Sequence, residues 1–153
     1  MQRRPLALLA TAVLSLAVGV SGCSSATGDA VSVTAGPVAS AAPASGATLD
    51  AADFAAALKA PGTVVLDVRT PAEFAEGHLP GALNLDVQSP DFTAQVAALD
   101  PSVPYAVYCR SGNRSQVALD VMARSGVTNA YHLGGGIGAW QQAGGDVVTG
   151  ATS

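Results

Sequence analysis

Cys109 is the first residue of a short polar loop, 109–115, whose composition suits nucleophilic chemistry on an anion. The loop follows an apolar run at 103–108 and precedes 116–123, where apolar residues recur at helical spacing. A buried strand that enters a helix through a glycine-containing loop leaves several backbone N–H groups unpaired and pointing into one small space. Those N–H groups and the positive end of the helix would favour the thiolate of Cys109. We interpret Cys109 as a nucleophile that is ionised and reachable by an anionic, electrophilic substrate.

The other residues of this loop are the candidates for binding that substrate. Arg114, nearest the expected helix start, is interpreted as an anion or loop contact, whereas Arg110 is equally consistent with a solvated surface charge. The alternative for Cys109 is a buried structural cysteine, which the polar and glycine-rich loop disfavours. The candidate substrate-binding residues are Arg110, Ser111, Gly112, Asn113, Arg114 and Ser115.

Two further segments are expected beside the Cys109 loop, because α/β sheets bind ligands at the carboxyl ends of their strands. Asp67 and Arg69 follow one apolar run and are interpreted as a structural ion pair near the site rather than as catalytic groups. Gly134–Gly136 follow another and should allow close backbone approach to the loop. His78 and His132 are interpreted as structural, and two histidines so far apart in the sequence make no metal motif. We expect no metal and no cofactor.

Capping residues and apolar periodicity predict the elements that position the loop. Thr70, Pro71 and Glu73 form a capping-box pattern for a short helix that should end at Gly77. Near-continuous apolar runs predict strands covered on both faces. Their alternation with helices predicts one α/β domain with a mostly parallel sheet. The expected strands are 63–68, 82–85, 103–108 and 129–133. A first helix is expected after Asp50 as its N-cap. The other expected helices are 71–76, 92–99 (capped by 89–91), 115–124 and 137–142.

Residues 1–22 resemble a bacterial lipoprotein signal peptide. Arg3 and Arg4 precede an apolar run, 6–20, that is short for a transmembrane helix, and the sequence Val-Ser-Gly-Cys ending at Cys23 resembles a lipobox. Lipidation of Cys23, for example with palmitate, would anchor the protein in the cell envelope, on the extracytoplasmic face of a bacterial membrane. The alternative is an ordinary secretory signal in which this cysteine is incidental.

The segment 23–46 is expected to be a lipid-anchored flexible linker to a domain at 47–153. It consists mainly of small residues with one charge, Asp29, and as a coil it would span on the order of 25 Å. Without the signal peptide the chain keeps five basic residues against eleven acidic ones, which excludes nucleic acid as a partner. With Cys23 modified, Cys109 is the only free thiol, so an intramolecular disulfide is excluded.

Four separated motifs lie between about residue 47 and residue 148: Asp67-Val68-Arg69 with Glu73-Phe74, the segment 77–82 with Asn84, the segment 108–115, and 133–136 with Ala139-Trp140. Together they resemble the rhodanese domain family. The resemblance implies a three-layer α/β/α fold with a five-stranded sheet, and a persulfide on Cys109. It also implies that the amides of 110–115 bind the sulfane sulfur and a small anionic donor such as thiosulfate. The acceptor would be cyanide or a thiol, for example on a thioredoxin-like protein.

Other functions on this fold remain open from the sequence. The domain could be a persulfide-relay or redox-partner binding module with little turnover. It could also be a phosphatase or an arsenate reductase, but the loop length disfavours both. Related cell-cycle phosphatases have one residue more between the cysteine and the arginine than the four residues between Cys109 and Arg114. The smaller ring suits a sulfur atom better than a phosphoryl group.

Overall fold

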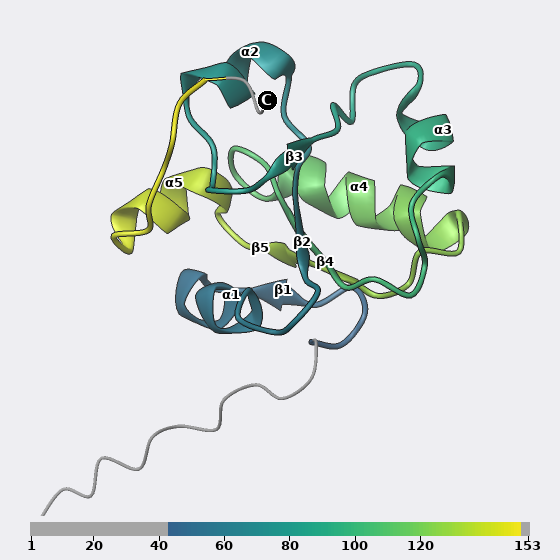
Figure 1. The fold of residues 1–153 in the computed structure, drawn as a ribbon, viewed down its shortest axis with the longest axis horizontal. Coiled ribbons are helices and arrows are strands. Elements are labelled where there is room, and N and C mark those ends of the chain that lie inside the picture. The colour runs from purple at the N-terminus through teal and green to yellow at the C-terminus, as the bar shows by residue number, and fades with distance from the viewer. Residues whose placement is uncertain (1–42, 151–153) are drawn as a thin grey trace, which may run out of the picture. The chain divides into compact units, whose positions relative to one another are not determined.

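Five short parallel strands form the sheet from which the Cys109 loop emerges (Figure 1). The computed structural model describes residues 43–150; the predicted signal peptide, Cys23 and the linker up to residue 42 lie outside the described residues. The strand order is β1-β5-β4-β2-β3, so β4 is central and its carboxyl end lies between the ends of β5 and β2. The strands are β1 (Thr48–Leu49), β2 (Val64–Asp67), β3 (Leu83–Asn84), β4 (Tyr105–Tyr108) and β5 (Ala130–Leu133).

Helices cover both faces of this sheet, which confirms the predicted α/β fold. All four strand pairs are parallel, whereas the sequence predicted a mostly parallel sheet. Among the described residues no helix has the length and apolar character needed to cross a membrane. The helices are α1 (Ala51–Ala57), α2 (Pro71–Glu76), α3 (Phe92–Ala97), α4 (Asn113–Arg124) and α5 (Gly136–Gln142).

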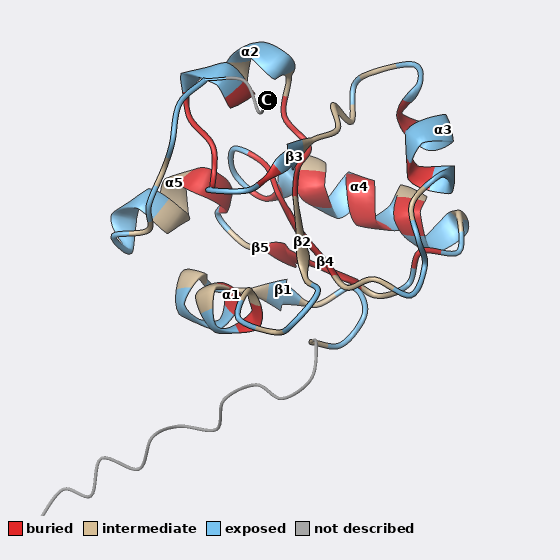
Figure 2. Cartoon of the chain, viewed as in Figure 1, coloured by how far each residue is buried: buried red, intermediate tan, exposed pale blue. Residues whose placement is uncertain are grey.

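The two faces of the sheet bury separate apolar clusters. Alternate residues of β4 point to opposite faces, so Val107 packs with residues of α3 and α4, while Tyr108 packs with residues of α1, α2 and α5. Figure 2 shows β4, β5 and the inward faces of the helices as buried, and β2 is buried towards its carboxyl end. Burial on both faces explains why the strands appear in the sequence as continuous apolar runs.

Local capping explains where α1 and α2 begin. Asp50 caps α1 by accepting the Asp53 N–H at 2.9 Å, and Thr70 and Glu73 form the predicted capping box of α2. The predicted cap of α3 at 89–91 is confirmed for Ser89, whose hydroxyl accepts the Asp91 N–H at 3.2 Å, but not for the Asp91 side chain. Asp91 stands at the N-cap position in a helical conformation and makes no capping bond with its side chain.

Two predicted boundaries near the site also need correction. Helix α4 begins at Asn113, two residues before the predicted start, because Gly112 takes the left-handed N-cap conformation. The first strand, β1, was not predicted from the residue pattern, since only two residues pair with β5 and Leu49 also stands just before a helix cap. The chain joins the sheet slightly earlier, where the Gly46 N–H donates to the Ala130 carbonyl at 2.7 Å.

Candidate active site

The Cys109 loop connects the central strand β4 to helix α4 and turns back over its own first side chain. Gly112 adopts φ +97°, a left-handed conformation that glycine enters without steric cost. In this conformation the Gly112 N–H donates to Cys109 Sγ at 3.1 Å. The loop therefore directs a backbone donor at the sulfur, as the sequence predicted.

Hydrogen bonds favour ionisation of this thiol. Burial raises the pKa of the Cys109 thiol, but donors around the sulfur outweigh burial and lower the pKa below that of an ordinary cysteine. These donors are the Ser115 hydroxyl and the N–H groups of Ser111, Ser115 and Gly112. The arrangement resembles a preformed anion site that is occupied by the sulfur itself.

Cys109 is nevertheless closed off from solvent. Its exposed fraction is 0%, and it belongs to the apolar cluster between the sheet and helices α3 and α4. The expected accessibility of the sulfur is therefore not met in this conformation. The next two residues of the loop, Arg110 and Ser111, are exposed.

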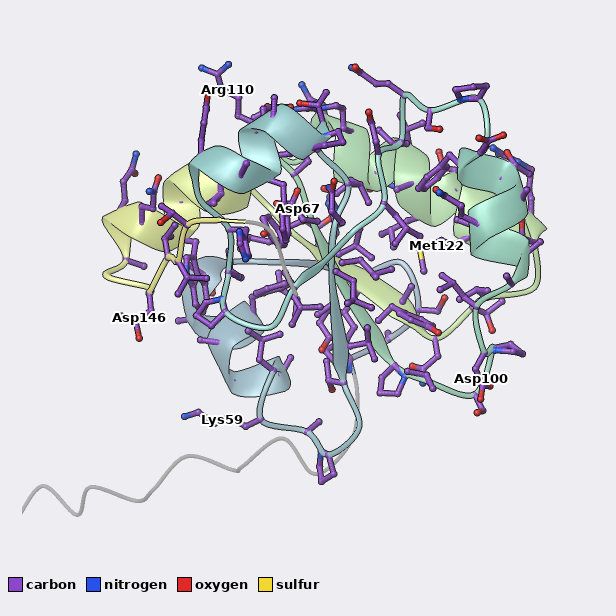
Figure 3. All side chains as sticks on the ribbon, turned by 45° about the horizontal axis from the view of Figure 1, so that its top comes forward. Lys59, Asp67, Asp100, Arg110, Met122 and Asp146 are labelled. Carbon is purple, nitrogen blue, oxygen red and sulfur yellow. The ribbon has the colours of Figure 1, made fainter. Side chains whose placement is uncertain are left out.

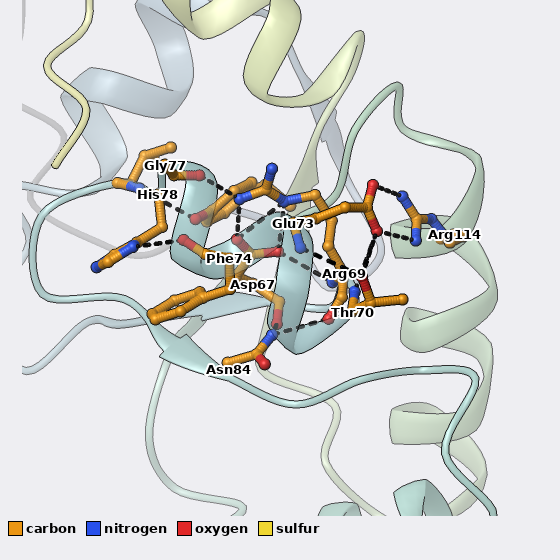
Figure 4. Close-up of polar contacts among 11 residues, drawn as sticks. Asp67, Arg69, Thr70, Glu73, Phe74, Gly77, His78, Asn84 and Arg114 are labelled. Carbon is orange, nitrogen blue, oxygen red and sulfur yellow. Dashed lines mark hydrogen bonds and ion pairs between the residues drawn. The ribbon is translucent and has the colours of Figure 1, made fainter. Parts of the chain in front are cut away.

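The two arginines of the loop occupy different environments. Arg110 is exposed, and Figure 3 shows its side chain extending away from the ribbon. Arg114 instead forms two hydrogen bonds to Glu73 of α2, at 2.8 Å and 2.7 Å, although it also interacts electrostatically with Cys109 (Figure 4). Asn113 is exposed at the first position of α4. These three side chains therefore surround the loop without contacting the sulfur.

Asp67 and Arg69 form the predicted ion pair at the carboxyl end of β2. Arg69 Nε lies 2.9 Å and 3.0 Å from the two carboxylate oxygens of Asp67, and Arg69 Nη2 also donates to the Gly77 carbonyl at 2.6 Å (Figure 4). Asp67 is fully buried and Arg69 is nearly so. The pair thereby fixes the segment after α2 to the end of β2, next to the strand that carries Cys109.

Gly136 lies directly against the Cys109 loop. A Cβ at Gly136 would overlap the carbonyl oxygen of Cys109 and the carbonyl group of Arg110. The next residue, Ile137, donates its N–H to that Cys109 carbonyl at 2.8 Å. The close backbone approach predicted for 134–136 is thus confirmed at Gly136.

A comparison with known protein families identifies this arrangement. The family model described as the rhodanese-like domain matches residues 50–143, which is more than half of the chain and includes every part of the site. The chain belongs to the rhodanese-like domain family. Its sequence is also similar to the "Thiosulfate sulfurtransferase GlpE" proteins of Pseudomonas entomophila and Stutzerimonas stutzeri. The first is 40% identical over 87 residues, covering 57% of this chain and 78% of the relative. The second is 39% identical over 86 residues, covering 56% and 76%.

Solved structures show the same fold. A rhodanese-related protein from Thermoplasma volcanium superposes with a TM-score of 0.60 at 31% identity, covering 67% of this chain and 97% of that structure. The five-stranded α/β sheet of the rhodanese-like domain is therefore shared by this chain, and its sequence similarity supports the sulfurtransferase family.

The sequence predicted local roles for Glu73 and His132 in this rhodanese-like domain but not the contacts that each makes with the residues of the Cys109 loop. Glu73 was predicted as a capping-box residue, but its contact with Arg114 depends on β2 and β4 being neighbours in the sheet. His132 was predicted to be structural, and the structure shows that its Nδ1 lies 2.8 Å from the hydroxyl of Ser115. Pairing between distant strands creates both contacts, so no local pattern could have indicated them.

His78 has the structural role expected of it. Its Nδ1 lies 2.9 Å from the Phe74 carbonyl, and its ring stacks on the Phe74 ring with centroids 3.7 Å apart. Beside this segment, a cleft of about 230 Å³ opens between α2, α5 and the C-terminal residues. Arg69 and Glu73 line its α2 side, and Ile137, adjacent to the Cys109 loop, lines the other.

Proposed function

We propose that this protein is a sulfurtransferase that carries a sulfane sulfur as a persulfide on Cys109. The observation that carries the proposal is the Gly112 N–H directed at Sγ within a loop whose donors lower the pKa of the thiol. Membership of the rhodanese-like family and similarity to proteins named thiosulfate sulfurtransferase support it. The loop binds one small anion, and a terminal persulfide sulfur is such an anion.

The first half-reaction loads the enzyme. The Cys109 thiolate attacks the outer sulfur of thiosulfate, a new S–S bond forms, and the bond between that sulfur and the sulfonate breaks. Sulfite leaves with the bonding electron pair, and the enzyme retains a persulfide with one negative charge. The loop N–H groups, those of Ser111, Gly112 and Ser115, then donate to the terminal sulfur.

The second half-reaction removes the terminal sulfur from the Cys109 persulfide. Cyanide or an external thiolate attacks the terminal sulfur and leaves as thiocyanate or as a new persulfide, and the Cys109 thiolate is regenerated. A protein persulfide donor would replace thiosulfate in the first step by the same exchange. Because the sulfur is transferred twice through one intermediate, the kinetics should be ping-pong.

The closed position of Cys109 adds a requirement to this mechanism. Since the side chain is fully buried, the loop over it must open before a donor can reach Sγ. Opening breaks the hydrogen bond from the Gly112 N–H to the sulfur and moves the exposed residues Arg110 and Ser111. We propose that Arg110, which has no buried contacts to lose, meets the anionic donor at this stage.

Thiocyanate formation from thiosulfate and cyanide tests the proposed function. The full chain should produce thiocyanate with parallel double-reciprocal plots, and Cys109→Ser should produce none. Persulfide formation on the protein without turnover to cyanide or small thiols would instead indicate a relay module that passes sulfur to one protein partner. Hydrolysis of p-nitrophenyl phosphate dependent on Cys109 would contradict the proposal and favour a phosphatase.

We further propose that Cys23 is lipidated and holds the domain at the outer face of a bacterial membrane. The support is the sequence of residues 1–23 alone. Labelling with radioactive palmitate in a bacterial host should mark the chain and should be lost in Cys23→Ala. A secreted, unlabelled product would contradict the anchor and leave the sulfur chemistry unaffected.

A further inference from the structure

A chain of hydrogen bonds runs from the exposed Thr48 on the edge strand β1 to the buried Cys109 loop. Nε2 of His132 lies 2.8 Å from the hydroxyl of Thr48, and Nδ1 of the same ring lies 2.8 Å from the hydroxyl of Ser115. The Ser115 hydroxyl in turn donates to the Gly112 carbonyl at 2.9 Å, and the Cys109 sulfur, whose pKa Ser115 helps to lower, is the alternative acceptor of the same proton. His132 has only 4% of its surface exposed, and Ser115 has none.

The protons in this chain can be assigned from its acceptors. The Gly112 carbonyl can only accept, so at 2.9 Å the proton between it and Ser115 belongs to the serine hydroxyl. His132 Nδ1 must then donate to the serine oxygen, which leaves Nε2 to accept from the Thr48 hydroxyl. Every donor in the chain therefore points from β1 towards the loop.

Ser115 can transfer its hydrogen bond to the sulfur at little cost. The Gly112 carbonyl also accepts the Gln116 N–H at 3.1 Å, so it stays satisfied when the serine hydroxyl rotates away. The rotated hydroxyl still receives the His132 Nδ1–H, and its single proton is then free to face a negatively charged sulfur. A histidine of the opposite tautomer would instead take that proton for itself.

We propose that His132 is a positioning residue of the sulfur site: by donating its Nδ1–H to the Ser115 oxygen, it leaves the serine proton free to turn from the Gly112 carbonyl to an anionic sulfur on Cys109. This inference rests on the proposed function for its purpose, but its geometry does not depend on turnover. Burial lowers the pKa of His132, in keeping with a neutral ring that exchanges no proton with substrate. Thr48 fixes the tautomer from the other side of the ring.

Charged groups near the sulfur are distinct from this chain. Arg114 on α4 acts electrostatically on both Cys109 and Asp67, and the Asp67–Arg69 pair stands at the end of β2. The sheet partners of His132, Val107 on β4 and Thr48 on β1, do not titrate. Variants at His132 therefore leave these charges in place.

The test measures the pKa of Cys109 by pH titration of the full chain. The thiolate is monitored by its absorbance near 240 nm, and the spectrum of the matching Cys109→Ser protein is subtracted. This readout requires neither sulfur donor nor access to the thiol, so it separates the failure of this inference from the failure of the proposed sulfur transfer. His132→Leu, which fills the space without a donor, should raise the pKa of Cys109 by about one unit, a tenfold loss of thiolate below the pKa. His132→Asn, whose amide can donate from near the Nδ1 position, should retain most of the wild-type value.

A double-mutant comparison shows whether His132 acts through Ser115. In a Ser115→Ala background, His132→Leu should produce no further change in the pKa of Cys109. An equal shift with and without the serine hydroxyl, or no shift in either, would overturn the proposal. His78→Leu is the matched control, because His78 is equally buried but bonds to the Phe74 carbonyl, and it should leave the Cys109 titration unchanged.

The tautomer gives a test that needs no substitution. Nitrogen NMR of the histidine rings should show His132 with a protonated Nδ1 and an unprotonated Nε2 in the wild-type chain. Thr48→Val should weaken this preference and raise the pKa of Cys109 less than His132→Leu does, while Thr93→Val on the exposed surface of α3 should do neither. A wild-type ring protonated at Nε2 would contradict the assignment.

Discussion

Glu73 and Arg114 form a two-point ion pair that ties helix α2 to the first turn of the helix after the Cys109 loop. Arg114 Nη1 and Nη2 lie 2.8 Å and 2.7 Å from the two carboxylate oxygens of Glu73, and about a quarter of each side chain is exposed. The same carboxylate also accepts the Thr70 N–H at 3.1 Å. One residue therefore caps α2 and restrains the end of the loop.

Replacing Glu73 by Gln should destabilise the fold by about 1 kcal/mol at neutral pH, because the pair is charge-assisted but partly exposed. The hydrogen bonds from Arg114, supported by those of Thr70, lower the pKa of Glu73 from 4.5 to about 2. A carboxyl with a depressed pKa in the folded state stabilises the protein above its unfolded pKa and loses this effect as pH falls towards the folded value.

Chemical denaturation of the wild type and of Glu73→Gln across pH measures this effect. The difference in unfolding free energy should be constant above about pH 5 and should shrink between about 4.5 and 2. Glu76→Gln is the control, since Glu76 is exposed on the same helix. A difference that stays constant down to pH 2 would show that the pair contributes no charge-dependent stability.

Asp67→Asn should lower the unfolding free energy by about 3 kcal/mol, because it leaves the buried Arg69 guanidinium without its counter-charge. The folded fraction should still accept a sulfur on Cys109, because the pair supports the site without entering it. Asp91→Asn, at an exposed N-cap whose side chain makes no capping bond, should change stability by less than about 0.5 kcal/mol. Loss of sulfur loading without loss of stability would instead give Asp67 a role in the chemistry.

Gly136→Ala should lower stability by about 3 kcal/mol or more and reduce sulfur transfer, because the added methyl group would displace the backbone at Cys109 and Arg110. Gly144→Ala is the matched control. Gly144 also has a positive φ, +81°, but a Cβ there meets nothing within 4 Å, so only the backbone cost of about 1 kcal/mol remains. Thermal melts and thiocyanate assays of both variants would distinguish the steric collision from the conformational cost. Equal losses of stability and activity in Gly136→Ala and Gly144→Ala would contradict the predicted collision.

The sequence predicted the parts of the fold that depend on local chemistry. The capping box at Thr70 and Glu73, the cap at Asp50 and the apolar runs of β2, β4 and β5 each follow from residues close together in the chain. The strand β1 was missed because its two residues gain their stability from pairing with β5, far away in the sequence. The start of α4 was misplaced because Gly112, rather than a polar residue, stands at its N-cap.

The candidate site was likewise predictable where its residues are close together in the chain, and not where they are brought together by the strand order. Cys109, Gly112 and Ser115 lie within one loop, and their convergence on the sulfur follows from a strand-to-helix turn. The strand order creates the contacts of Arg114 with Glu73 and of Ser115 with His132, and local spacing carries no information on that order. Nor does the sequence encode whether the loop is open or closed over the thiol.

The most direct test of the account is the intact mass of the protein after incubation with thiosulfate and removal of the excess donor. The wild-type chain should gain the mass of one sulfur atom, about 32 Da, lose it on addition of cyanide or a reducing thiol, and show no gain in Cys109→Ser. An unchanged mass with thiosulfate and with persulfide donors, or a gain that persists in Cys109→Ser, would contradict a sulfur carried on Cys109.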